Sequence, residues 1–115
     1  MLPQETAVLE ELFGTGVAER YESDLRMIAL PAVPLPEGCR PATAMGIYVP
    51  HQYMGYNTRL FFESPITLRS GVQPPHTVAV LLGRTMYAAS INGIPANLPL
   101  HQGVLAHLRR YELAA

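Results

Sequence analysis

The feature that most constrains the fold is a pair of apolar and aromatic segments joined by a loop that begins with proline. Residues 43–49 read TAMGIYV and residues 59–63 read RLFFE, a composition typical of β-strands. Pro50 has no backbone N–H, so it ends the first segment without leaving an unpaired donor. The ring of Tyr53 can pack beneath the loop while its hydroxyl bonds to the backbone. We therefore expect two neighbouring antiparallel strands connected by a tyrosine-anchored corner.

The segments before this pair predict a helix followed by a hairpin. Residues 5–13 place their apolar side chains on one face and their glutamates outside, which is typical of a short amphipathic helix. Residues 17–22 and 25–33 are expected to be strands joined by a Ser-Asp turn. The prolines of residues 31–41 predict a stiff, irregular connection. The first half is thus a helix and a four-stranded antiparallel meander, with the helix covering one face.

The second half is less regular and is expected to end in a helix. Residues 77–82 and 86–91 are compatible with two short strands joined through Gly83 and Arg84. Residues 100–113 have the apolar spacing of a closing helix. The length of 115 residues corresponds to one domain. The sequence therefore predicts a single α+β domain over residues 1–115.

Charge and cysteine content exclude several classes of function. The formal net charge is −1 and the arginines are scattered, so no basic surface for nucleic acid is expected. The apolar runs are too short for a membrane span, and the first residues do not resemble a signal peptide, so we expect a cytoplasmic protein. Cys39 alone can form neither an internal disulfide nor a cysteine-rich zinc site. His101 and His107 point to different faces of the last helix, so no metal site is expected, and no glycine-rich phosphate loop follows a strand, so no nucleotide cofactor is expected either.

Two features of the composition each have two interpretations. Charged residues make up only 15% of the chain, which fits either a surface covered by a partner or a domain with polar, uncharged loops. All eight basic residues are arginine. This fits either a GC-rich genome or the avoidance of amine acceptors near an activated acyl group.

Two segments resemble the ubiquitin-conjugating-enzyme (UBC-like) family. These are LPEG at residues 35–38, just before a strand, and IYVPHQYMGYNTRLFFESPITL at residues 47–68. They are most similar to the prokaryotic UBC-like family usually lettered E, which has an LPxG segment and a proline-tyrosine loop between the third and fourth strands. The resemblance implies a UBC-like fold with an N-terminal helix, a four-stranded meander, an irregular segment on the active-site side and a C-terminal helix.

The resemblance also implies partners and a pathway. The family accompanies bacterial ubiquitin-like proteins and their adenylating enzymes, so these two proteins are the expected partners, in conjugation pathways that include antiphage defence. Whether the chain forms a homo- or hetero-oligomer is left open. The residues proposed to bind a partner are Tyr53, Tyr56 and Phe62.

The chain departs from the family pattern at several positions, and it lacks a cysteine where a conjugating enzyme needs one. Met54 stands where the family loop has proline, and Arg59 replaces a usual acidic residue. A conjugating enzyme of this type carries its acyl group on a cysteine after the fourth strand. Cys39 lies before the third strand, so we interpret it as structural or incidental.

A non-cysteine nucleophile is therefore considered. Ser90, in YAASING, resembles the family serine before the last loop and would form an oxyester. His76 and His101 are the candidate bases, and Asn92 is the candidate oxyanion donor. The alternative interpretation of all four is that they are polar residues of the surface and loops.

Three functional hypotheses remain. The first is a transferase that carries the ubiquitin-like protein through an oxyester. The second is a non-catalytic binding subunit that recruits the ubiquitin-like protein or its adenylating enzyme. The third is that an alanine such as Ala88 or Ala89 marks a lost cysteine.

Overall fold

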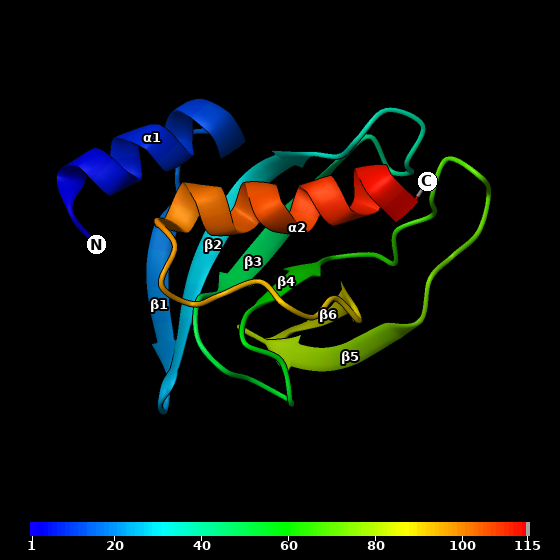
Figure 1. Ribbon diagram of the computed structural model, residues 1–115. Coiled ribbons are helices and arrows are strands. Elements are labelled where there is room, and N and C mark those ends of the chain that lie inside the picture. The colour runs from blue at the N-terminus through cyan, green and yellow to red at the C-terminus, as the bar shows by residue number, and fades with distance from the viewer. Residues whose placement is uncertain (115) are drawn as a thin grey trace.

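The computed structural model describes residues 1–114 and contains two helices and one six-stranded antiparallel sheet (Figure 1). The α+β class is confirmed. The strand order is β1-β2-β3-β4-β6-β5. In chain order the elements are α1 (Pro3–Phe13), β1 (Ala18–Glu22), β2 (Leu25–Pro34), β3 (Thr43–Val49), β4 (Arg59–Phe62), β5 (His76–Leu81), β6 (Arg84–Ala89) and α2 (Leu100–Ala114).

Local signals explain the limits of α1. Pro3 occupies the first turn, where a missing N–H costs no helical hydrogen bond, so the helix begins earlier than residue 5. The Glu5 carboxylate accepts a hydrogen bond from the Leu2 N–H at 2.9 Å. Gly14 ends the helix with φ 96°, and its N–H bonds to the Glu10 carbonyl at 3.0 Å. The helix therefore spans the expected segment plus one half-turn.

The corner between β3 and β4 has the predicted form. Tyr53 and Tyr56 exchange backbone hydrogen bonds of 2.9 and 3.1 Å around a two-residue turn. Met54 (φ 51°) and Gly55 (φ 84°) both lie in the left-handed region, which a proline cannot adopt. This geometry excludes proline at position 54. The Tyr53 ring packs on Phe61 with the ring centroids 6.0 Å apart.

The sheet is larger than the four-stranded meander that the sequence predicts. The part expected to be irregular contains the β5–β6 hairpin, and Phe62 of β4 lies opposite Tyr87 of β6. The hairpin turn is made by Leu82 (φ 52°) and Gly83 (φ 74°), so Arg84 already belongs to β6. The two short strands expected in the second half are therefore present, and their pairing with the free edge of β4 extends the expected four-stranded meander to a six-stranded sheet.

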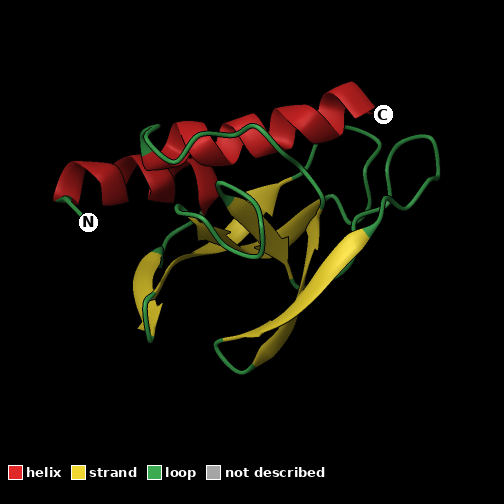
Figure 2. Ribbon diagram, turned by 60° about the horizontal axis from the view of Figure 1, so that its bottom comes forward, coloured by secondary structure: helices red, strands yellow, loops and turns green. Residues whose placement is uncertain are grey.

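The curled sheet separates two cores. Figure 2 shows both helices on one side of the strands, and the core on that side includes Leu9, Phe13, Phe62, Val104 and Tyr111. On the other face the sheet curls on itself, and the Leu82 N–H donates to the Glu22 carboxylate at 2.9 Å. This joins the β5–β6 turn to the end of β1 and encloses a second core. Its buried members are Met27, Ile47, Val49, Phe61, Leu81, Met86 and Ala88.

Candidate functional site

Ser90 lies at the mouth of a small apolar cavity. It follows β6 and is exposed. The cavity is about 150 Å³ in volume and lies against the last turns of α2; it is lined by Leu68, Pro74, Pro75, Ala89, Ser90, Ile91, Arg110 and Tyr111. Burial raises the pKa of Tyr111 to about 12, so its hydroxyl stays protonated at neutral pH. The titratable groups that line this cavity therefore offer no general base to Ser90.

His76 is held by the backbone and does not serve Ser90. It lies opposite Ala89 in the β5–β6 ladder, one residue from the predicted nucleophile. Its Nε2 accepts a hydrogen bond from the Ile66 N–H at 3.2 Å, so this lone pair is occupied. Burial lowers the pKa of His76, with an opposing contribution from a hydrogen bond to the Pro74 backbone. The imidazole of His76 therefore connects the backbone at Ile66 with the backbone at Pro74.

Of the other predicted members of the catalytic set, His101 is separated from the Ser90 cavity by the length of α2. His101 is in the first turn of α2, ten residues before Tyr111, which is about 15 Å along the helix axis. Asn92 is exposed in the loop between β6 and α2. Ala88 and Ala89 are both buried, so a cysteine at either position would have been hidden from a partner. Cys39 is also buried.

The three residues predicted to bind a partner differ in exposure. Tyr53 and Tyr56 are half-buried in the corner. Phe62 is 0% exposed and makes an edge contact with Tyr111, with ring centroids 6.1 Å apart. The prediction for Phe62 is therefore wrong. Both edges of β4 are paired, with β3 and β6, and both of its faces are covered because Phe61 and Phe62 enter different cores.

A buried polar cluster joins the sheet to α2. The Thr58 hydroxyl donates to the Ile94 carbonyl at 3.2 Å and lies 2.8 Å from His107 Nε2. Since the hydroxyl has a single proton, His107 must donate from Nε2. Burial, followed by the charges of Arg59 and Arg110, lowers the pKa of His107 to about 4. The imidazole is therefore neutral at pH 7 and fixes the helix to the loop before it.

Arg59 is a buried cation stabilised by aromatic rings. Its side chain is 1% exposed, and its guanidinium carbon lies 4.0 Å from the centroid of Tyr56 and 5.4 Å from that of Phe61. Nη2 donates to the Ala88 carbonyl at 3.4 Å. Burial lowers the pKa of Arg59, while neighbouring tyrosines oppose that shift. Within residues 1–114 no carboxylate forms an ion pair with it. Tyr56 thus covers a buried charge, which explains its half-buried position.

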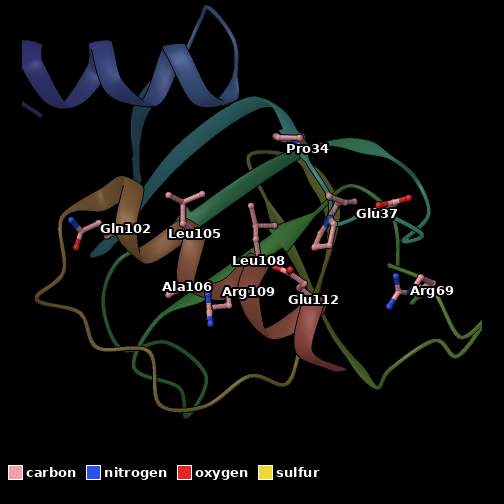
Figure 3. A pocket seen from close by; sticks show the side chains of 11 residues that line it. Pro34, Glu37, Arg69, Gln102, Leu105, Ala106, Leu108, Arg109 and Glu112 are labelled. Atoms are coloured by element: carbon pink, nitrogen blue, oxygen red, sulfur yellow. The ribbon is translucent and has the colours of Figure 1, made fainter. Parts of the chain in front are cut away.

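A surface groove of about 700 Å³ lies between the proline-rich connection and α2 and is here called the α2 groove (Figure 3). The connection forms one wall, α2 forms the other, and Arg69 stands at one end. Leu105 projects from α2 and is 42% exposed. The lining residues are Pro34, Leu35, Pro36, Glu37, Arg69, Gln102, Leu105, Ala106, Leu108, Arg109 and Glu112. An apolar floor with charges of both signs at its rim is suited to a polypeptide segment.

The LPEG segment builds one wall of this groove. Gly38 has φ 88°, and a Cβ placed there would lie 2.6 Å from Arg69 Cδ. Glycine therefore permits Arg69 to lie across the segment. The sequence pointed to residues 35–38 through the resemblance alone and gave no indication of a groove. The apolar spacing of residues 100–113 predicts Leu105 on the inward face of the helix, but the structure leaves it 42% exposed, so the opposite wall was not predicted either.

Comparisons of the chain with protein-family models, with curated proteins and with solved structures find no match. Among residues 1–114, no helix is both long and apolar enough to cross a membrane. The same residues contain no cluster of three or more histidine, cysteine, aspartate or glutamate side chains arranged to hold a metal ion. Functional inference therefore depends on the geometry described above and on the resemblance of residues 35–38 and 47–68.

Proposed function

We propose that the chain is a non-catalytic UBC-like binding subunit of a bacterial ubiquitin-like conjugation pathway, acting in the cytoplasm. It recruits the ubiquitin-like protein or its adenylating enzyme. The observation that carries this proposal is the β3–corner–β4 unit, which falls on the residues that resemble the family and has Tyr53 at its turn. The order of α1, four meander strands and a closing helix supports the same fold.

The arrangement around Ser90 favours binding over catalysis. A serine must lose its proton to a base as it attacks an acyl group. His76 is engaged by backbone, and His101 is at the other end of α2. Ser90 is thus exposed, and in the part of the chain that the structure describes neither candidate histidine is placed to remove its proton.

The α2 groove is the proposed docking surface for the recruited partner. Leu105 supplies exposed apolar area, and Leu35 and Leu108 form the floor beneath it. Arg69 and Arg109 can form ion pairs with carboxylates of a bound polypeptide segment. Glu37 and Glu112 can form ion pairs with basic side chains of the same segment. The two positive and two negative side chains at the rim therefore favour a partner segment whose charges are arranged in the complementary order.

Leu105→Asp is expected to weaken binding of the recruited protein roughly tenfold or more, because it places a charge in the apolar part of the groove. Leu113→Asp is the matched control, since Leu113 is a 69% exposed leucine of the same helix that does not line the groove. The measurement is isothermal titration calorimetry with the purified ubiquitin-like protein and with the adenylating enzyme. Equal affinities for both variants would exclude the groove as the docking surface.

A second candidate function is the oxyester carrier. One observation favours it: Arg110 lines the same small cavity as Ser90. A cation at this place can stabilise a developing oxyanion.

Incubation with the adenylating enzyme, the ubiquitin-like protein and ATP tests this candidate. If the chain is a non-catalytic binding subunit, it forms no covalent adduct, and denaturing mass spectrometry is expected to show an unchanged mass. A mass gain that disappears in Ser90→Ala, and that hydroxylamine reverses, would establish the carrier instead. A mass gain that persists in Ser90→Ala would exclude Ser90 and also contradict the non-catalytic assignment.

A further inference from the structure

The β5 strand is an unprotected edge of the sheet. Within residues 1–114 it pairs with β6 alone and is last in the strand order. Val78 and Val80 are 53% and 71% exposed, although valine is ordinarily buried. Figure 2 shows the β5–β6 hairpin extending beyond the region that the helices cover. The outer face of this hairpin is therefore apolar and open.

The free hydrogen-bonding groups of β5 belong to the same two valines. In a two-residue hairpin the residues that flank the turn exchange both backbone hydrogen bonds, and such pairs then alternate along the ladder. Leu81 lies opposite Arg84 around the turn, so Leu81, Ala79 and Thr77 bond to β6. The N–H and C=O groups of Val78 and Val80 consequently point away from β6.

The opposite edge of the sheet shows how this chain protects an edge. There β1 carries Glu19, Arg20 and Glu22, and Glu19 pairs with Arg26 at 2.6 Å and with the N-terminal amine at 3.2 Å. Charged side chains on an edge strand discourage pairing with another strand. The β5 strand reads HTVAVL and has no Asp, Glu, Lys, Arg or Pro. The β1 edge is thus protected by charged side chains, whereas the β5 edge is not.

We propose that β5 pairs antiparallel with β5 of a second copy of this chain, forming a symmetric dimer with a continuous sheet. The twofold axis passes between the two Ala79 residues, so Val78 of each copy lies opposite Val80 of the other. This register lets each valine pair exchange backbone hydrogen bonds and brings the exposed side chains together on one face. A second copy fits because an uncharged strand meets an identical uncharged strand without like-charge contact.

The dimer is tested by sedimentation equilibrium of the full chain over a wide concentration series. The wild type is expected to show a monomer–dimer equilibrium. Val78→Lys combined with Val80→Lys places lysines opposite each other twice, and the dissociation constant is expected to rise roughly tenfold or more. Val72→Lys is the matched control, because Val72 is similarly exposed but lies in the loop before β5. Circular dichroism confirms that each variant is folded.

The register is tested by mixing two single variants. Val80→Lys and Val78→Glu are each expected to dimerise less than the wild type, and their mixture is expected to recover a heterodimer because lysine then lies opposite glutamate. A mixture of Val80→Lys with Val80→Glu does not place the two charges opposite each other, so it is expected to recover less. A wild type that stays monomeric at every concentration, or a dimer unaffected by the double lysine variant, would overturn the proposal.

Discussion

Gly103→Ala is expected to lower the free energy of unfolding by about 3 kcal/mol, although the same change in a helix usually stabilises by about 1 kcal/mol. Gly103 is buried in α2, directly against Tyr48 of β3. A Cβ there would lie 2.7 Å from Tyr48 Cζ, far inside van der Waals contact. Tyr48 is 1% exposed and packs against His107, so it has no room to retreat. Urea denaturation measures the change.

Two further variants separate this clash from a general effect on the helix. Gln102→Ala changes an exposed neighbour in the same turn and is expected to alter the free energy of unfolding by less than about 0.5 kcal/mol. In a Tyr48→Leu background, where the distal ring atoms are absent, Gly103→Ala is expected to cost less than in the wild type. Wild-type stability of Gly103→Ala would show that α2 does not pack on β3 as described.

Lowering the pH from 7 to 5 is expected to remove about 2 kcal/mol of stability through His107. The pKa of His107 is depressed to about 4 in the folded protein, and the unfolded value is near 6.5. In this window the unfolded chain therefore binds a proton that the folded chain does not, and the free energy of unfolding falls as pH falls. The contribution is fully present above the unfolded pKa and is lost progressively down to about pH 4.

Urea denaturation at pH 7 and pH 5 checks this result. In His107→Gln the amide can still donate to Thr58 but does not titrate, so the loss between the two pH values is expected to be smaller by about 2 kcal/mol. His101→Gln makes the same change at the start of α2 and is expected to retain the wild-type pH dependence. An identical pH dependence in His107→Gln and the wild type would contradict a neutral, buried His107.

The sequence predicted the elements that depend on local signals. The alternation of apolar and polar residues, the prolines and the turn residues were sufficient to predict β3, β4 and the β1–β2 hairpin. The spacing of apolar residues was sufficient to predict α2. The corner at Tyr53 was predicted as well, because Pro50 and the aromatic strand fix its limits. These features involve residues close together in the chain.

Features that depend on distant contacts were missed. Nothing near Phe62 indicates that the β5–β6 hairpin pairs with β4 and closes a second core, so one phenylalanine was wrongly placed outside. Thr58 and His107 are 49 residues apart and meet only after α2 packs on the sheet. For the same reason closeness in sequence did not bring His101 to Ser90, because His101 is at the start of α2 and the Ser90 cavity lies against its last turns.

Arg59 shows how the fold accommodates a buried positive charge. An arginine in place of an acidic residue suggests an exposed charge, yet the side chain is buried between β4 and the corner. Tyr56 stacks on the guanidinium, and the Ala88 carbonyl accepts one hydrogen bond. The corner and this cation therefore stabilise each other.

The most direct test of the binding-subunit account is amide NMR of the ¹⁵N-labelled full chain during titration with the ubiquitin-like protein and, separately, the adenylating enzyme. If the chain is a binding subunit, one of the two partners is expected to shift or broaden the amide signals of Gln102, Leu105 and Arg109, while the amide signals around Ser90 keep their positions. Spectra that neither partner changes, or changes confined to the Ser90 cavity, would contradict it.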